Sequence, residues 1–303
     1  MCSSDLIIGD IVGSVYEFNN IKTKKFPLFS ERSIYTDDSI MTIAVAKSLM
    51  ESRDNQSSLK KTLIKNMREY GRKYPHAGYG GMFAQWLVLD NPVPYNSFGN
   101  GSAMRVSPCG LIAVTLQEAL DLARASAEVT HNHPEGIKGA QATAAAIFLA
   151  KYGKSKDEIK EYIESNFYML DKSLDDIRPR YSFNETCQET VPQAIIAFLE
   201  SEDYEDAIRN AISLGGDSDT LAAITGSIAW AFYRRNISTL LDEYAVQYDQ
   251  LGYTLSKAME DAKAQAEGIL PADIVEFIRT FDELCIYRAG AYERIGIIKG
   301  IPI

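Results

Sequence analysis

Two short polar segments carry more carboxylates than the start of a helix needs. Gly215-Gly216-Asp217-Ser218-Asp219-Thr220 precedes a run of small and apolar residues with a helical pattern. Near the N-terminus, Thr36-Asp37-Asp38-Ser39 also precedes an apolar helical run. A single Asp, Ser or Thr oxygen is enough to cap a helix. Capping can explain either segment alone, but each places extra negative charge at the positive end of a helix dipole.

Together, the two segments predict a site for two metal ions. If the two helix N-termini face each other, they offer four carboxylates and two hydroxyls. That supply would suit two divalent cations about 3.5–4 Å apart. Because all the donors are oxygens, two Mg²⁺ or Mn²⁺ ions are favoured over zinc. The predicted metal ligands are Thr36, Asp37, Asp38, Asp217, Asp219 and Thr220.

A third segment could bind phosphate. It reads Ser97-Phe98-Gly99-Asn100-Gly101-Ser102-Ala103-Met104-Arg105. Its glycines would let backbone N–H groups approach an anion closely, and a following helix could add its dipole. A structural turn explains the same glycines when they are considered alone.

The three segments, in this order, resemble the ADP-ribosylglycohydrolase family, which contains ADP-ribosylarginine hydrolases and dinitrogenase reductase-activating glycohydrolase. The resemblance runs from about residue 9 to about residue 233. It implies an orthogonal helix bundle with a dimetal site. It also implies hydrolysis at C1″ of ADP-ribose, with an ADP-ribosylated protein as substrate and ADP-ribose as product.

The resemblance also implies roles for single residues. Glu17 would be a solvent-exposed helix-end glutamate on its own, but it matches a family acid that points into the active site. The expected catalytic residues are Glu17, which would position or deprotonate water, with Asp37 and Asp219. His131, in a Thr-His-Asn-His-Pro run, would contact the distal ribose or the pocket wall. The expected substrate-binding residues are Gly99, Asn100, Gly101, Ser102, Met104 and His131.

The bond to be cleaved is predicted to be the N-glycosidic bond to arginine. A guanidinium stays protonated at neutral pH, which suits it as a leaving group in a site rich in carboxylates. The Thr-His-Asn-His-Pro run is similar to that of the activating glycohydrolase. By contrast, Ser97-Phe98 stands where some bacterial arginine-type members carry an acid.

Other functions remain open at this stage. The same site could act on serine-linked ADP-ribose or a small ADP-ribose ester, or the chain could bind ADP-ribose without catalysis. A non-catalytic binder would be expected to have lost metal ligands, and here all six positions and Glu17 are filled. A Mg²⁺-dependent phosphohydrolase would share the oxygen ligands but leaves the Gly99 segment unexplained.

Composition narrows the class of protein. The net charge of −10 and the pI of about 5.0 argue against nucleic-acid binding, which needs a basic face. Cys2, Cys109, Cys187 and Cys285 show no C-x-x-C spacing, so neither zinc nor a redox pair is indicated. No apolar run approaches the ~20 residues that span a bilayer, and no signal peptide is evident, so we expect a cytoplasmic protein without membrane contact.

The periodicity predicts an all-α fold in one domain, residues 1–303. The pattern favours a tightly packed helix in residues 6–18 and a long polar loop, a lid or plain solvated charge, in residues 19–35. Residues 296–303 could form a docking tail or a subunit contact. Further helices are expected at residues 37–51, 55–74, 116–129, 139–152, 156–166, 203–213, 221–234 and within 237–288.

Overall fold

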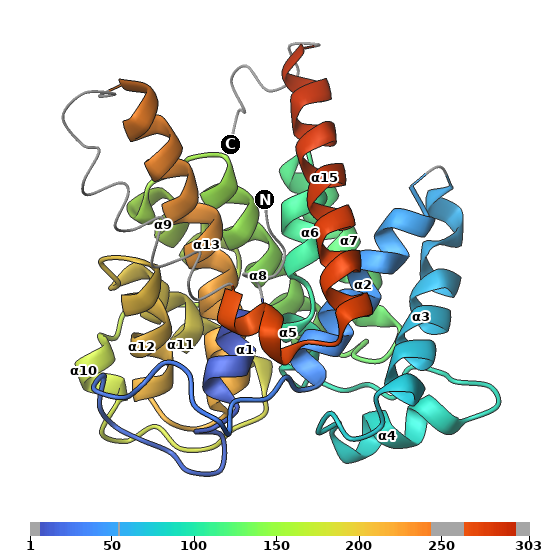
Figure 1. Ribbon diagram of the computed structural model, residues 1–303, viewed down its shortest axis with the longest axis horizontal. Helices are drawn as coiled ribbons and strands as arrows, with labels where there is room; N and C mark the ends of the chain where they lie inside the picture. The colour runs from blue at the N-terminus through green and yellow to red at the C-terminus, as the bar shows by residue number, and fades with distance from the viewer. Residues whose placement is uncertain (1–6, 54, 244–263, 295–303) are drawn as a thin grey trace.

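The computed structural model describes residues 7–53, 55–243 and 264–294, and these residues form helices joined by loops (Figure 1). Within those ranges the only β-type pairing is an isolated bridge between Gly99 and Thr186, so the all-α prediction is confirmed. The helices are α1 (Ile8–Gly13), α2 (Asp37–Glu51), α3 (Leu59–Lys73, after a 3₁₀ turn Gln56–Ser58), α4 (Gly81–Val88), α5 (Gly101–Met104), α6 (Ser107–Ile112), α7 (Leu116–Glu128), α8 (Pro134–Lys151), α9 (Lys156–Asn166), α10 (Leu174–Ile177), α11 (Cys187–Leu199), α12 (Tyr204–Ser213), α13 (Ser218–Glu243) and α15 (Ala272–Arg294).

Helix α13 is a central element, and α1 lies directly against its first turns (Figure 1). The approach is possible because α1 carries glycines on the shared face. A Cβ atom on Gly9 would lie 2.0 Å from the carbonyl oxygen of Ala222. A Cβ atom on Gly13 would lie 2.5 Å from the Cα atom of Asp219. The small residues of both helices therefore bring α1 to the second predicted metal-binding segment, at the start of α13.

Side-chain caps set the starts of several helices where the sequence predicts them. Thr36 caps α2, and its hydroxyl oxygen accepts from the amide of Asp38 at 3.3 Å. Ser155 and Glu158 form a reciprocal capping box at the start of α9, whose bounds equal the predicted ones. Such caps satisfy amides that have no partner inside the helix.

Some predicted boundaries differ from those in the structure. The packed N-terminal segment is helical only to Gly13 and then turns, since the amide of Tyr16 bonds to Gly13 O rather than continuing the helix. Helix α13 runs nine residues past its predicted end at Arg234, to Glu243. The short helix α10 lies where the sequence analysis expects no helix. The predicted docking tail, residues 296–303, lies outside the described ranges.

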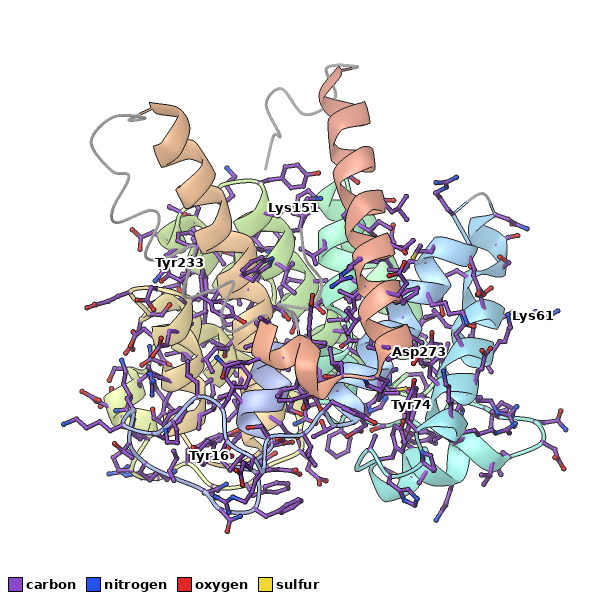
Figure 2. The ribbon with its side chains drawn as sticks, viewed as in Figure 1. Tyr16, Lys61, Tyr74, Lys151, Tyr233 and Asp273 are labelled. Carbon is purple, nitrogen blue, oxygen red and sulfur yellow. The ribbon has the colours of Figure 1, made fainter. Side chains whose placement is uncertain are left out.

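Helix α15 returns to the end of α3 late in the chain. Figure 2 shows Tyr74 and Asp273 side by side, and the Tyr74 hydroxyl donates to Asp273 Oδ2 at 3.1 Å. The ammonium of Lys73 pairs with the same carboxylate. None of the described helices is both long enough and apolar enough to cross a bilayer.

Candidate active site

The three segments singled out in the sequence meet at the beginnings of α2 and α13. The Thr220 hydroxyl donates to Asp38 Oδ2 at 3.2 Å, which joins the start of α13 to the start of α2. The Asn100 amide nitrogen donates to Asp217 Oδ2 at 2.7 Å, which joins the glycine-rich segment to the same place. The facing of the two helix starts, expected from their sequences, is therefore present.

A buried carboxylate that the sequence analysis did not single out fixes the start of α2. Asp10, on α1, is fully buried, and its Oδ2 atom accepts from the amide of Thr36 at 3.0 Å and the amide of Ser39 at 3.1 Å. The Ser39 hydroxyl also donates to Oδ2, and the Thr36 hydroxyl donates to Oδ1 at 2.7 Å. The Thr36 hydroxyl proton is thus already used, so its oxygen can offer only a lone pair to a cation.

Glu17 lies beside two of the predicted metal ligands, Asp217 and Asp219. One carboxylate oxygen from each of Glu17, Asp217 and Asp219 lies within 4.8 Å of the other two, an arrangement that could hold a metal ion. Sequence reasoning assigned Glu17 to the attacking water, and this position is compatible with contact to either the water or an ion.

Glu17, Asp37, Asp38, Asp217 and Asp219 form an acidic cluster. Ionising all of its carboxyl groups is unfavourable because they are buried and repel one another. Burial raises the pKa of Glu17 to about 7, with a further rise from the charge of Asp217. Burial raises the pKa of Asp37 to about 8, with Asp10 as the next cause. The pKa values of Asp38 and Asp219 also lie well above the ordinary carboxyl range, first because both are buried. Divalent cations would remove this penalty, because an opposite charge favours the ionised form.

The donor set fits hard cations. Asp38 Oδ1 and Asp219 Oδ1 are buried and have no hydrogen-bond partner, which is costly for a polar atom unless something else binds it. The groups around them are carboxylates and hydroxyls, the ligands that suit Mg²⁺ or Mn²⁺. Helix dipoles at the starts of α2 and α13 offset part of the negative charge but leave these oxygens unpaired.

Asn20 ties the Glu17 segment to the turn before Asp217. Its side-chain oxygen accepts from the amide of Gly216 at 2.7 Å, and its amide nitrogen donates to Gly216 O and Glu17 O, each at 2.8 Å. Gly215 and Gly216 have φ angles of +68° and +77°, which glycine adopts readily. Nearby, the Lys22 ammonium donates to Tyr181 O at 2.6 Å and to Leu214 O. Sequence reasoning missed these links because they join residues up to 196 positions apart.

The glycine-rich segment has fewer free amides than its sequence suggests. The Asn100 amide donates to Glu185 O at 2.7 Å, and the Gly99 amide donates to Ser97 Oγ at 3.1 Å. The first amides of α5, those of Gly101 and Ser102, have no intrahelical acceptor. Helix α5 is only four residues long and Ser102 is fully buried, so the amide of the half-buried Gly101, rather than a strong helix dipole, is what the segment offers to an anion.

The remaining predicted substrate contacts have other protein neighbours. The side chain of Asn100 bonds to Asp217 and to Thr190 Oγ1, and the sulfur of Met104 lies 4.0 Å from Thr220 Oγ1. Both residues therefore link the glycine-rich segment to the acidic cluster. The His131 ring lies beside Gly101, where a Cβ atom would be 3.2 Å from Nε2.

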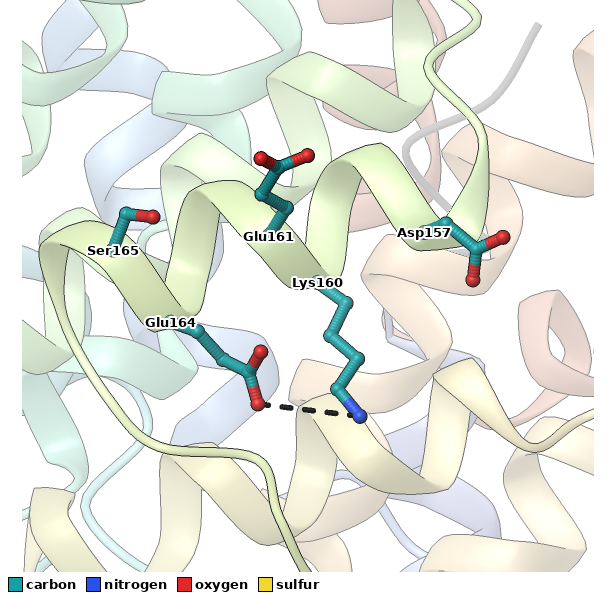
Figure 3. A pocket seen from close by; sticks show the side chains of 5 residues that line it. All are labelled: Asp157, Lys160, Glu161, Glu164 and Ser165. Atoms are coloured by element: carbon teal, nitrogen blue, oxygen red, sulfur yellow. Dashed lines mark ion pairs between the residues drawn. The ribbon is translucent and has the colours of Figure 1, made fainter.

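Two other surface features lie outside the predicted set. Phe18, next to Glu17 and 80% exposed, stacks on Phe183 with the ring centroids 6.2 Å apart. A shallow hollow on the outside of α9 is lined by charged and polar side chains, with Lys160 and Glu164 paired at 4.0 Å (Figure 3). The residues that line it are Asp157, Lys160, Glu161, Glu164 and Ser165, and none belongs to the acidic cluster.

Comparisons with known proteins show the family to which the chain is similar. The ADP-ribosylglycohydrolase family model matches residues 6–263. The mouse (Mus musculus) protein ADP-ribosylhydrolase ARH3 is 28% identical and aligns over 77% of this chain and 82% of its own length. ADP-ribosylarginine hydrolase Tri1 of Pseudomonas putida is 24% identical and aligns over 75% of this chain and 68% of its own length. A solved structure described as an ADP-ribosylglycohydrolase-related protein complex has the same fold, with a TM-score of 0.59 at 21% identity, covering 88% of this chain and 94% of that one.

Proposed function

Because the chain belongs to the ADP-ribosylglycohydrolase family, we propose that it is a metal-dependent hydrolase that removes mono-ADP-ribose from arginine side chains of proteins. The observation that carries the proposal is the convergence of carboxylates from three places in the chain. Glu17 follows α1, Asp38 is the second residue of α2, and Asp217 and Asp219 flank Ser218, the first residue of α13. The predicted ligands Thr36, Asp37 and Thr220 lie at the same two helix starts.

The predicted ligands would hold two Mg²⁺ or Mn²⁺ ions. When bound, such ions orient hydroxyl groups of a ligand and lower the pKa of a water molecule. The chain's own contribution is to hold them through Asp37, Asp38, Asp217 and Asp219, and to leave Asp38 Oδ1 and Asp219 Oδ1 without protein partners.

The carboxylates also suit the charge that forms in the reaction. Cleavage of a glycosidic bond builds oxocarbenium-like positive charge at C1″, which nearby carboxylates stabilise. Water attacks C1″, and the bond from C1″ to the guanidino nitrogen breaks with its electron pair going to the nitrogen. Glu17 takes a proton from the water and passes it on, so arginine leaves as an intact guanidinium. The amide of Gly101, which has no intrahelical acceptor, would bind the diphosphate.

Two observations favour arginine as the modified side chain. A guanidinium is attracted to a carboxylate-rich site and forms paired hydrogen bonds with carboxylates. One of the relatives, Tri1, is named an ADP-ribosylarginine hydrolase. The ARH3 relatives carry a name without a stated linkage, so the test must include a second bond.

The decisive experiment incubates an ADP-ribosyl-arginine peptide and an ADP-ribosyl-serine peptide with the enzyme and Mg²⁺, with and without EDTA. Mass spectrometry should show EDTA-sensitive release of ADP-ribose from the arginine peptide. Asp219→Asn should slow release by at least about a hundredfold, whereas Asp157→Asn on the exposed face of α9 should not. Release from the serine peptide alone would overturn the choice of arginine, and release from neither would overturn hydrolysis of both bonds.

A further inference from the structure

A buried guanidinium lies behind the glycine-rich segment without an acidic partner. Arg105 follows α5 directly and is 1% exposed. Its Nη2 atom donates to Ser126 O at 2.9 Å and to the Thr130 hydroxyl oxygen at 2.8 Å. Among the described residues, no carboxylate forms an ion pair with Arg105. A buried charge of this kind usually has a specific task, because leaving it unpaired is costly.

Thr130 links this guanidinium to a histidine. The hydroxyl oxygen of Thr130 lies 2.7 Å from His131 Nδ1, and the two groups share one hydrogen bond. A guanidinium can only donate, so the Thr130 oxygen accepts from Arg105 and keeps its own proton to give away. Thr130 Oγ1 has no further acceptor in the described part of the chain, so that proton goes to Nδ1.

The direction of this bond fixes the state of the imidazole. When Nδ1 accepts, the single proton of a neutral ring must sit on Nε2. Nε2 faces the glycine-rich segment, 3.2 Å from where a Cβ atom on Gly101 would lie and 3.5 Å from one on Gly99. No protein group in the described ranges is hydrogen-bonded to Nε2. An N–H donor without a protein acceptor therefore stands beside Gly101, the half-buried first residue of α5.

We propose that Arg105 and Thr130 are positioning residues that hold His131 as its Nε2–H tautomer, so that this N–H donates to an oxygen of the ADP-ribose diphosphate beside Gly101. The choice of ligand rests on the proposed function, whereas the tautomer does not. The arrangement gives the anion two donors at one place, the Gly101 amide and the imidazole. It also places the unneutralised Arg105 charge behind them, where it attracts a phosphate.

The surroundings keep the ring neutral. Burial lowers the pKa of His131 well below its ordinary value, and the nearby Arg105 charge lowers it further. The Tyr95 ring covers another side, with its centroid 5.9 Å from that of His131. A neutral ring with one defined proton has a fixed donor direction, which a freely titrating histidine lacks.

The test is ¹⁵N NMR of the imidazole nitrogens in the full-length enzyme, which carries only three histidines. In the wild type at pH 7, His131 should show a protonated Nε2 and an unprotonated Nδ1. His133, whose Nδ1 accepts from the Glu135 amide at 3.1 Å, is an internal reference that should not change between variants. A protonated Nδ1 on His131 would overturn the proposal.

Thr130→Val separates positioning from packing, because valine keeps the shape of threonine and removes the hydroxyl. It should move the Nδ1 resonance toward that of a nitrogen without a hydrogen bond, and Thr130→Ser should restore it. Thr143→Val is the matched control: Thr143 is equally buried on α8, but its hydroxyl has no partner, so the His131 signals should stay in place.

Ligand binding gives the second readout. By calorimetry with Mg²⁺ present, Thr130→Val should bind ADP-ribose about tenfold more weakly than the wild type, equivalent to ~1.4 kcal/mol, and Thr143→Val should bind it equally well. Equal affinity of Thr130→Val and wild type would overturn the diphosphate contact. Because neither measurement needs turnover, both outcomes stay interpretable if the hydrolysis assay fails.

Discussion

Replacing Asp10 with asparagine tests whether the acidic site depends on a residue outside its predicted ligand set. Asp10 accepts from both the amide and the hydroxyl of Thr36 and of Ser39. An asparagine can keep one acceptor oxygen, and at the Oδ2 position that oxygen retains three of the four bonds. The new amide nitrogen would then face the Thr36 hydroxyl as a donor. The hydroxyl oxygen would have to accept, which occupies the lone pair that a cation needs.

The expected sizes follow from the bonds involved. A hydrogen bond to an ionised group stabilises by about 1.5–3 kcal/mol and a neutral one by about 0.5–1.5 kcal/mol, so four bonds that each weaken by about 1–1.5 kcal/mol cost roughly 4–6 kcal/mol. Burial raises the pKa of Asp10, which shows that its charge is itself unfavourable and offsets part of this loss. We expect a net loss of about 1–3 kcal/mol. Partners that orient ligands typically change metal affinity by about 10–100-fold when replaced.

The assay for Asp10→Asn is calorimetric titration with Mg²⁺, paired with thermal unfolding in EDTA. Mg²⁺ affinity should fall about 10–100-fold, and Tm in EDTA should fall by roughly 2–10 °C. Asp203→Asn is the control: its side chain caps α12, asparagine caps equally well, and the acidic cluster is elsewhere. Unchanged Mg²⁺ affinity with a lowered Tm would refute the reasoning, because Asp10 would then only support the fold.

Three further predictions concern the same site. Because the pKa values of Glu17 and Asp37 are raised to about 7 and about 8, the metal-free fold binds more protons than the unfolded chain. The stability of the metal-free protein should therefore fall as pH rises toward 8. Mg²⁺ binding should release protons, so the Mg²⁺ affinity should rise by up to about tenfold per pH unit for each proton released. Calorimetry in two buffers measures both the affinity and the number of protons released. Asn20→Ala should lower kcat about tenfold with little change in ADP-ribose affinity, since it frees the backbone of Glu17; a change confined to KM would contradict this. Gly13→Ala should lower Tm and weaken Mg²⁺ binding, because the added Cβ atom would press on the start of α13. Gly80→Ala is the control: a Cβ atom there has no neighbour within 4 Å, so Tm in thermal unfolding and Mg²⁺ affinity in calorimetric titration should both stay unchanged.

The parts of the site that follow from local chemistry could be predicted from the sequence. Thr36 is a helix cap whatever the fold, and the acids after it belong to the first turn of α2. Gly215 and Gly216 indicate a turn with positive φ angles, and the structure has both. Because each segment carries its own signal, the two helix starts could be recognised separately. That they face each other was inferred from their shared composition.

The supporting contacts could not be predicted in this way, because each joins segments that are distant in sequence. Asp10 bonds to residues 26 and 29 positions later, and Asn20 to Gly216, 196 positions later. Asp10 did carry one signal, a carboxylate inside the apolar run Ile7-Ile8-Gly9-Asp10-Ile11-Val12, where burial demands partners. Asn20 carried none, since an asparagine in a polar loop is ordinary.

The two ends of the site differ in charge, and this difference links its two ligands. Buried acids make the predicted metal end strongly negative even though the helix dipoles offset part of the charge, and without cations this end would repel the diphosphate of ADP-ribose. The other end offers the amide of Gly101 with Arg105 behind it, and both attract an anion. Cations at the first end therefore convert repulsion into attraction for the whole ligand. By thermodynamic linkage, Mg²⁺ must strengthen ADP-ribose binding by the same factor by which ADP-ribose strengthens the binding of Mg²⁺.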